Sequence, residues 1–286
     1  MTTTPNAIPS ATPSITPGNS PSTIAKAIAA DRTTTHLPII LCAMQEEAEP
    51  WFDMAESHEQ VAAYGKSTWF YLQLKQQDLV LGISGIGLVN AASATTIAIT
   101  QFLPPAIIYT GTCGGLAASV NVRDIICGNS YIYGTADATA FGYQRGQVPQ
   151  MPKYYSGDAQ LLHRAKSPQS HTLAPHNAEA RDNTETPNSQ TPHAQRILQG
   201  EVVSSDSFVT ATNVDQFRKD FPDALSVDME SCAAAQVCYS YGVPFVSIRG
   251  VSDLCSPQGA QEFHINTDTA AKAPQQAVLA ALSHYL

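Results

Sequence analysis

Apolar residues in this chain fall in short continuous runs, and the stretches between them carry helix-like spacing and many small residues. Continuous runs rich in Ile and Val are typical of strands buried on both faces of a sheet. Strands are therefore expected at residues 37–44, 79–84, 106–110, 124–133, 201–205 and 243–251. Helical stretches such as QEEAEPW and AASATTIAITQF follow the first two runs. This alternation predicts an α/β fold with a largely parallel sheet.

Two segments depart from the pattern because they are rich in Ser, Thr, Pro and other polar residues. They are residues 1–35 and about 165–195. Such a composition buries too little apolar surface to offset the entropy lost on ordering. We therefore expect a disordered tail over 1–35, followed by one domain over 36–286 with a flexible insertion at about 165–195.

The composition is that of a globular protein with an acidic balance. The chain has 286 residues, a net charge of −9 and a pI near 5.2. This charge argues against nucleic acid and against an anionic membrane as partners. The six cysteines form no CxxC pair, and the eight histidines show no HExxH spacing. We therefore expect reduced thiols, a cytoplasmic location, no metal and no cofactor.

Residues suited to chemistry stand directly after several of the expected strands. Ligands of open α/β sheets bind outside the carboxyl ends of the strands, so these positions are expected to share one crevice. They comprise two glycine turns, an aromatic side chain and three acids, namely Glu47, Gly85, Gly87, residues 111–115, Phe208, Glu230 and Asp253. Each has a structural explanation when taken alone, but together they indicate a ligand site with carboxylates available for acid–base chemistry.

Seven motifs in this order resemble the methylthioadenosine/S-adenosylhomocysteine nucleosidases of the nucleoside phosphorylase superfamily. The motifs are AMQEEAEP, SGIGLVNAA, TGTCGGL, DATAFGYQRGQVP, SSDSFV, SVDMES and RGVSDL. The resemblance covers about residues 37–160 and 199–286. It implies a three-layer α/β/α domain with a central mixed, largely parallel sheet. It also implies an enzyme that hydrolyses the N-glycosidic bond of 5′-thioadenosine nucleosides to adenine and the thioribose, in methionine salvage and the recycling of S-adenosylmethionine by-products.

The resemblance also assigns roles to individual residues. Glu47 matches the general base that activates water, Asp253 the residue that assists protonation of the purine, and Glu230 the ligand of the ribose hydroxyls. The other matches contact the substrate: Met229 at the ribose, Phe208 and Val209 at the adenine, Thr112, Gly114 and Ser252 in the pocket, and Phe263, Phe141 and Pro149 in the apolar 5′-subsite. The resemblance implies a homodimer in which the last two reach the neighbouring subunit's site.

Some positions depart from the usual family pattern. A small serine–alanine pair is replaced by Thr112 and Cys113, a glutamate by Asp228, and an alanine by Ser231. The acids of SVDMES can stabilise the start of a helix in two ways. An acid there can accept hydrogen bonds from backbone N–H groups, or its charge can complement the helix dipole. We expect Asp228 to be the helix cap and Glu230 to be the substrate ligand.

Other functions remain open at this stage. A phosphorolytic purine nucleoside phosphorylase of the same fold would need cationic side chains to hold phosphate, whereas the MQEEAEP loop is acidic, which favours water. An aminodeoxyfutalosine nucleosidase would recognise the same adenosine half of its substrate. A catalytically silent nucleoside-binding domain would not need a water-activating base such as Glu47.

Overall fold

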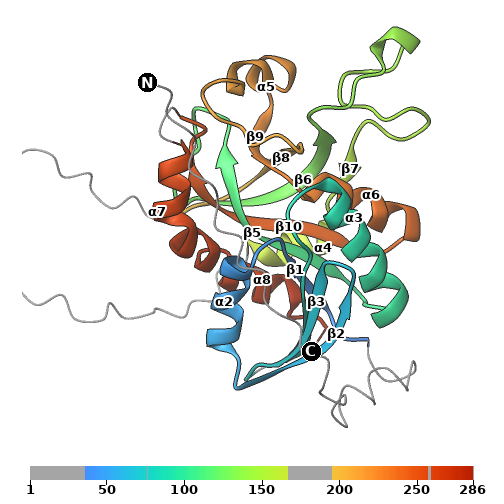
Figure 1. Cartoon of the computed structure of the whole chain (residues 1–286), viewed down its shortest axis with the longest axis vertical. Coiled ribbons are helices and arrows are strands. Elements are labelled where there is room, and N and C mark those ends of the chain that lie inside the picture. The colour runs from blue at the N-terminus through green and yellow to red at the C-terminus, as the bar shows by residue number, and fades with distance from the viewer. Residues whose placement is uncertain (1–35, 76, 167–194, 257–258, 286) are drawn as a thin grey trace, which may run out of the picture.

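The computed structural model describes residues 36–75, 77–166, 195–256 and 259–285 (Figure 1). The predicted tail over 1–35, and the insertion apart from its two ends, lie outside these described residues. The strands are β1 (Ile39–Cys42), β2 (Ser57–Tyr64), β3 (Ser67–Gln73), β4 (Asp78–Ile83), β5 (Ile107–Gly115), β6 (Ile125–Tyr133), β7 (Tyr155–Ser156), β8 (Ile197–Ser204), β9 (Ala224–Asp228) and β10 (Phe245–Asp253). The helices are α2 (Gln45–Met54), α3 (Leu88–Ile97), η1 (Ala98–Phe102), η2 (Thr139–Phe141), α4 (Ala159–Ala165), α5 (Val214–Asp220), α6 (Ser231–Tyr241), α7 (Gly259–Lys272) and α8 (Gln275–Leu282).

All strands belong to one mixed sheet. Parallel pairings join β4, β1, β5 and β10 into one group and β6, β8 and β9 into another. Antiparallel pairings connect the groups, because β10 pairs with β6 and β5 pairs with β9. The strands β5, β10, β6, β8 and β9 therefore close into a ring, while the antiparallel β3 and β2 extend the opposite edge. The mixed sheet confirms the expected fold class, with its parallel part divided between two groups.

Helices cover both faces of this sheet and create two hydrophobic layers. On one face, α3, η1 and α6 pack small and apolar residues against β1, β5 and β10, including Ala91, Phe102 and Ala234. On the other face, α2, α4 and α8 contribute Trp51, Leu162 and Val278 among others. Figure 1 shows the same division, with α3 and α6 on one side of the strands and α2, α7 and α8 on the other. Within the described residues, no helix has the length and apolarity that a membrane span requires.

The hydropathy pattern predicted most strands but not the hairpin of β2 and β3 or the strand β9. The continuous apolar runs correspond to β1, β4, β5, β6, β8 and β10, which confirms those expectations. The hairpin of β2 and β3 was not expected, because β2 is an edge strand whose residues are half-buried or exposed. SVDMES lies at a helix start as expected, since α6 begins at Ser231, but residues 224–228 form the short strand β9, which was not expected.

The ring explains why residues from both strand groups can face one site. Strands β5 and β10 run parallel, and Gly114 pairs with Asp253 near their carboxyl ends. Strand β9 approaches from the opposite direction, and Val227 near its own carboxyl end pairs with the same Gly114. The carboxyl ends of the two groups therefore meet instead of pointing apart.

Candidate active site

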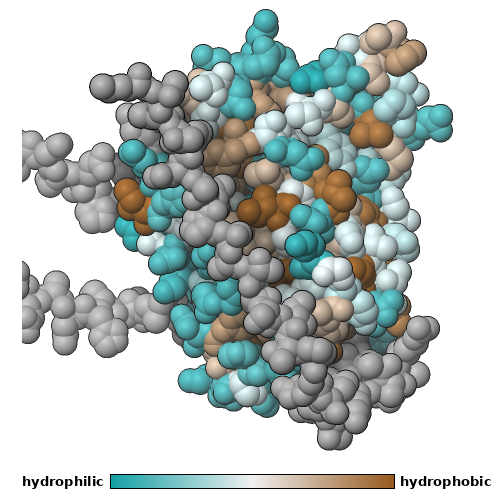
Figure 2. All heavy atoms as spheres, viewed as in Figure 1, coloured by the Kyte–Doolittle hydropathy of each residue, from teal (hydrophilic) through white to brown (hydrophobic). Residues whose placement is uncertain are grey.

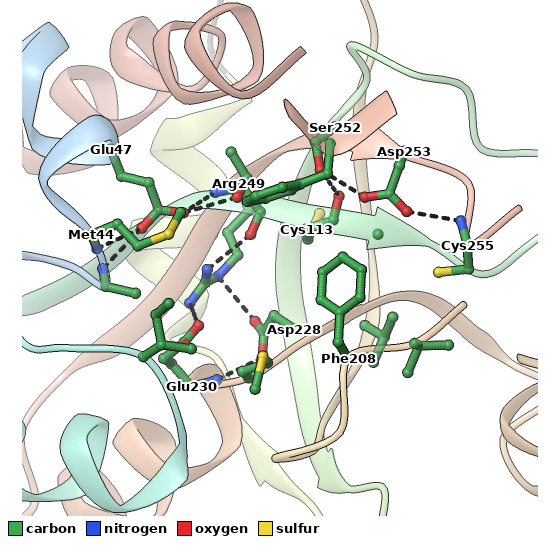
Figure 3. Close-up of a pocket in the computed structure, with 18 of the residues that line it drawn as sticks. Met44, Glu47, Cys113, Phe208, Asp228, Glu230, Arg249, Ser252, Asp253 and Cys255 are labelled. Carbon is green, nitrogen blue, oxygen red and sulfur yellow. Dashed lines mark hydrogen bonds and ion pairs between the residues drawn. The ribbon is translucent and has the colours of Figure 1, made fainter. Parts of the chain in front are cut away.

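A pocket lies where these strand ends meet (Figure 3). It contains about 710 Å³ of space outside the protein atoms, a volume that includes open solvent at its mouth. Figure 2 shows hydrophobic side chains gathered in a recessed part of the surface below α5. The lining residues are Ala43, Met44, Glu47, Ile86, Thr112, Cys113, Gly114, Ser207, Phe208, Val209, Val227, Asp228, Met229, Glu230, Arg249, Ser252, Asp253, Cys255 and Phe263.

Glu47 is buried in the first turn of α2 and held by hydrogen bonds to both of its oxygens. Oε2 accepts from the backbone N–H groups of Ala43 (2.9 Å) and Met44 (3.3 Å). Oε1 accepts from the backbone N–H and the hydroxyl of Thr112, at 2.8 and 2.9 Å. A Cβ atom on Gly111 would lie only 2.3 Å from the Glu47 carboxyl carbon, so glycine is required for this approach. Residues 111–115 were expected to form a turn but continue β5, and Gly111 within this strand makes room for the carboxylate.

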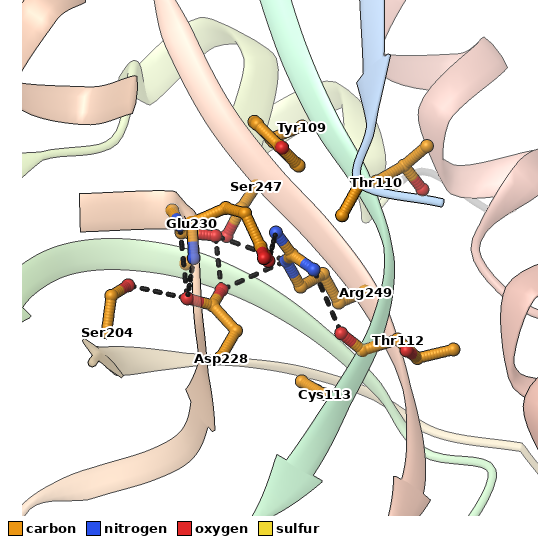
Figure 4. Close-up of polar contacts among 12 residues, drawn as sticks. Tyr109, Thr110, Thr112, Cys113, Ser204, Asp228, Glu230, Ser247 and Arg249 are labelled. Carbon is orange, nitrogen blue, oxygen red and sulfur yellow. Dashed lines mark hydrogen bonds and ion pairs between the residues drawn. The ribbon is translucent and has the colours of Figure 1, made fainter. Parts of the chain in front are cut away.

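Arg249 occupies the pocket floor in β10, and its side chain is 2% exposed. Each of its three nitrogens donates one hydrogen bond: Nε to Ser231 Oγ (3.1 Å), Nη1 to the Thr112 carbonyl (2.9 Å) and Nη2 to Glu230 Oε2 (3.1 Å) (Figure 4). Nε also forms an ion pair with Asp228 Oδ2 at 3.0 Å. The Tyr109 ring lies 4.8 Å from the guanidinium carbon. Burial lowers the pKa of Arg249, but the neighbouring carboxylates outweigh this effect and raise it, so the side chain stays cationic.

Glu230 is buried beside Arg249 and reaches the N-terminus of α3. Its Oε1 accepts a 3.0 Å hydrogen bond from the backbone N–H of Gly87, and its Oε2 accepts from Arg249. Burial raises the pKa of Glu230 to about 7; Arg249 and the Gly87 N–H oppose the rise, while Asp228 and Glu47 add to it. A carboxylate in this position can accept hydrogen bonds from the hydroxyl groups of a sugar and can stabilise a nearby positive charge.

Asp228 ends β9, and its two oxygens serve different partners. Oδ1 accepts from the backbone N–H groups of Glu230 and Ser231, both at 3.1 Å, and from the Ser204 hydroxyl at 2.5 Å. The expected capping is therefore confirmed, although the residue at the N-cap itself is Glu230. Oδ2 pairs with Arg249. The sequence predicted the contacts to the helix start but did not reveal this buried ion pair.

Asp253 lies at the end of β10, buried to 2% exposure. Its Oδ2 accepts a 2.9 Å hydrogen bond from the Ser252 hydroxyl, and its Oδ1 accepts one of the same length from the backbone N–H of Cys255. Asn266 of α7 donates to the Ser252 carbonyl at 3.0 Å and ties the helix to this strand end. In Figure 3, Asp253 and Glu47 lie at opposite ends of the pocket, with Arg249 and Glu230 between them.

Aromatic and apolar side chains form the remaining wall. Phe208 and Phe263 contact each other edge to face, with ring centroids 5.8 Å apart. Phe208 is 44% exposed, which leaves its ring available to a ligand, whereas Val209 beside it is 4% exposed. The site therefore combines three separated carboxylates with a surface on which a planar ring can stack.

All of the site residues that the resemblance assigns line the pocket except Phe141 and Pro149. Of the glycines expected in the crevice, Gly114 lines the pocket and the others, Gly85, Gly87, Gly111 and Gly115, do not. Phe141 lies in η2 and is 84% exposed, and Pro149 is also exposed. Sequence reasoning assigned no role to Arg249. A signal for it existed, because an arginine within a continuously apolar strand must have buried acceptors. Among the described residues, no group of three or more His, Cys, Asp or Glu side chains is arranged to hold a metal ion.

Comparisons with known proteins match both the chain and its fold. The family model for the phosphorylase superfamily matches residues 39–283. A 5′-methylthioadenosine/S-adenosylhomocysteine nucleosidase of Staphylococcus aureus is 38% identical over 213 residues, which cover 73% of this chain and 83% of that protein. The Neisseria meningitidis nucleosidase structure in complex with methylthio-immucillin-A has a TM-score of 0.73 and 32% identity, covering 88% of this chain and 100% of the other. The Colwellia psychrerythraea nucleosidase structure in complex with adenine has a TM-score of 0.75 and 29% identity, covering 87% and 96%.

Proposed function

Because this chain belongs to the phosphorylase superfamily and, within it, to the methylthioadenosine/S-adenosylhomocysteine nucleosidases, we propose that it hydrolyses the N-glycosidic bond of 5′-thioadenosine nucleosides. The products are free adenine and the thioribose. The observation that carries this proposal is the pocket itself, in which Glu47, Glu230 and Asp253 are separately anchored around a stacking surface. A silent binding domain would have no use for a buried carboxylate like Glu47.

The three acids divide the chemistry between them. Cleavage of an N-glycosidic bond develops positive charge on the ribose and negative charge on the purine. In its ionised form, Glu230 accepts hydrogen bonds from the ribose hydroxyls and stabilises the cationic ring. Asp253 assists protonation of the leaving purine, and Glu47 takes a proton from the attacking water. This is the acid-and-base arrangement of inverting glycoside hydrolysis applied to a nitrogen leaving group.

The pocket chemistry supports water over phosphate as the nucleophile. Among the described lining residues, Arg249 is the one cation. Each of its three nitrogens donates to a protein acceptor and its side chain is only 2% exposed, which makes it poorly suited to hold phosphate. The buried carboxylate of Glu47 would repel phosphate but can accept a proton from water.

We expect the purified protein to release adenine from methylthioadenosine in buffer that contains EDTA and no phosphate. A substrate panel of methylthioadenosine, S-adenosylhomocysteine, 5′-deoxyadenosine and aminodeoxyfutalosine, followed by adenine release, ranks the 5′ groups. Addition of phosphate should leave the rate unchanged. Strict dependence on phosphate would instead make the chain a phosphorylase, and binding of all four nucleosides without turnover would make it a binding domain.

A homodimer would explain the exposed residues that the resemblance assigns to the 5′-subsite. The segment that bears Phe141 is held in place by Arg145, which donates to the carbonyls of Gly134 and Ala136 and pairs with Asp220 of α5 at 3.1 Å. An ordered segment that exposes a large aromatic ring is suited to contact a second chain. We infer that Phe141 and Pro149 complete the 5′-subsite of the neighbouring subunit.

Phe141→Ala is therefore expected to lower kcat/KM for methylthioadenosine by about 10-fold to 100-fold, since burial of a Phe side chain is worth roughly 1.5–3 kcal/mol. Phe141→Leu should retain most of the activity because it keeps an apolar side chain. Sedimentation at assay concentrations should give a dimer for both variants. A fully active monomer of the unaltered protein would contradict the shared site.

The state of the thiols supports a cytoplasmic location. All six cysteines are free and buried. Burial raises the pKa of the Cys42, Cys232 and Cys238 thiols above their usual value, so they stay protonated and unreactive. Unpaired thiols of this kind suit a reducing compartment.

A further inference from the structure

Ser231 is a buried polar residue that does not line the pocket, and the proposed chemistry leaves its role unexplained. It is the first residue of α6 and is 0% exposed. Its hydroxyl contacts Asp228 Oδ2 and also receives the Nε–H of Arg249 at 3.1 Å. It therefore lies between a carboxylate and a guanidinium, both of which line the pocket.

The chemistry of these partners fixes the direction of each hydrogen bond. A guanidinium can only donate, so the Ser231 oxygen must be the acceptor of the bond from Arg249. The single hydroxyl proton is then directed to Asp228, which accepts it as a carboxylate. Ser231 thus links Asp228 to Arg249 in addition to their direct 3.0 Å ion pair.

This link sets the plane of the Arg249 guanidinium. Nε is held on one side by Ser231 and Asp228, and Nη1 is held by the Thr112 carbonyl. With those two nitrogens fixed, Nη2 is directed at Glu230 Oε2. Loss of the Ser231 oxygen would leave Nε with Asp228 alone, and the guanidinium could turn toward that carboxylate and away from Glu230.

We propose that Ser231 is a positioning residue for the reaction, which acts through Arg249 to keep Glu230 oriented and ionised for the ribose. This inference rests on the proposed function for its consequence in turnover. The contacts with Arg249 and Asp228 that carry it stand independently of the substrate.

The charged and titratable groups around Glu230 decide the sign of the effect. They are Arg249 from β10, Asp228 from β9, Glu47 from α2 and Tyr109 from β5, together with the Gly87 N–H and Asp206, which follows β8 and accepts from the Leu88 N–H of α3. Arg249 is the one cation in this set, and it opposes the rise in the pKa of Glu230. A weaker contact between Arg249 and Glu230 must therefore move the ionisation of Glu230 to higher pH.

The test compares Ser231→Ala with a matched control, Ser204→Ala. Ser204 is equally buried and donates to the same carboxylate, but its hydroxyl contacts Asp228 Oδ1 and the backbone N–H of Cys232, and not Arg249. Both variants remove one buried hydroxyl bonded to Asp228. If the two hydroxyls served only helix capping or stability, the two variants should behave alike. A positioning role of Ser231 instead predicts that the ionisation of Glu230 shifts in Ser231→Ala and not in Ser204→Ala.

In the unaltered enzyme, kcat/KM should rise with pH through about 7 as Glu230 ionises, because kcat/KM reports groups of the free enzyme. Ser231→Ala is expected to move this rising limb upward by about half to one pH unit, which is about threefold to tenfold in rate below the midpoint. Ser204→Ala should leave the midpoint in place. An unchanged midpoint in Ser231→Ala, or an equal shift in both variants, would overturn the proposal.

A second readout does not require turnover. Carbon-13 NMR of labelled glutamate side chains, with Glu230→Gln to assign the signal, follows the ionisation of Glu230 directly. The same upward shift is expected in Ser231→Ala and not in Ser204→Ala. If the unaltered protein released no adenine, the proposed function would fail, yet this titration would still support or overturn the role of Ser231.

Discussion

Asp253→Asn is expected to lower kcat for methylthioadenosine by about 10²- to 10⁴-fold while nucleoside binding largely survives. Asp253 is buried, and both of its oxygens accept hydrogen bonds from the protein. Asparagine has nearly the same shape, its oxygen can still accept from the Cys255 N–H, and the Ser252 hydroxyl can turn to accept from its amide. The substitution therefore removes the group that handles the purine proton and changes little else.

Single-turnover adenine release and calorimetric binding of the nucleoside measure the two effects separately. Asp124→Asn serves as the matched control, since Asp124 is also buried but pairs with Arg196 and does not line the pocket. It should reduce thermal stability without reducing kcat. An Asp253→Asn enzyme with a kcat within threefold of the unaltered protein would exclude the carboxylate from proton transfer.

Glu47→Gln is expected to lower kcat by a similar factor, about 10²- to 10⁴-fold, because a neutral amide cannot take a proton from water. The amide also introduces a conflict. All of the groups around Glu47 present hydrogens, so the amide nitrogen must face donors such as the Ala43 and Met44 N–H groups. Some loss of stability should accompany the loss of rate, and thermal melting measures it.

The neighbouring acid provides the control for this variant. Glu46 lies in the same helical turn but is exposed and does not line the pocket. Glu46→Gln should retain full activity. If Glu46→Gln and Glu47→Gln reduced kcat equally, the general charge of this turn, and not the buried carboxylate, would be responsible.

The strands that carry the site were predictable because they are buried on both faces. Such strands read as continuous apolar runs, as at β1, β5 and β10. Strand β9 was not predictable, because it has only five residues and their pattern, ALSVD, does not distinguish a strand from a helix start. The hairpin of β2 and β3 was not predicted for a different reason. The edge strand β2 has half-buried or exposed residues and therefore lacks a clear hydrophobic pattern.

The site residues after the strand ends were predictable from position and from motif order, but the contacts among them were not. The bond from Arg249 to the Thr112 carbonyl joins residues 137 positions apart. It exists because the register of β10 on β5 places Arg249 opposite Gly111, and no local pattern encodes that register. The same holds for Gly87 and Glu230, which are 143 positions apart. The role that we propose for Phe141 would depend on a second chain, so the fold of one subunit does not contain it.

The most direct test of hydrolysis in this pocket is the fate of the attacking oxygen. Methylthioadenosine is incubated with the protein in water enriched in oxygen-18, with phosphate present, and the sugar product is analysed at once by mass spectrometry. We expect one heavy oxygen in the methylthioribose, no sugar phosphate, and loss of this product in Glu47→Gln. An unlabelled sugar 1-phosphate as the main product would contradict it, because phosphate and not water would then be the nucleophile.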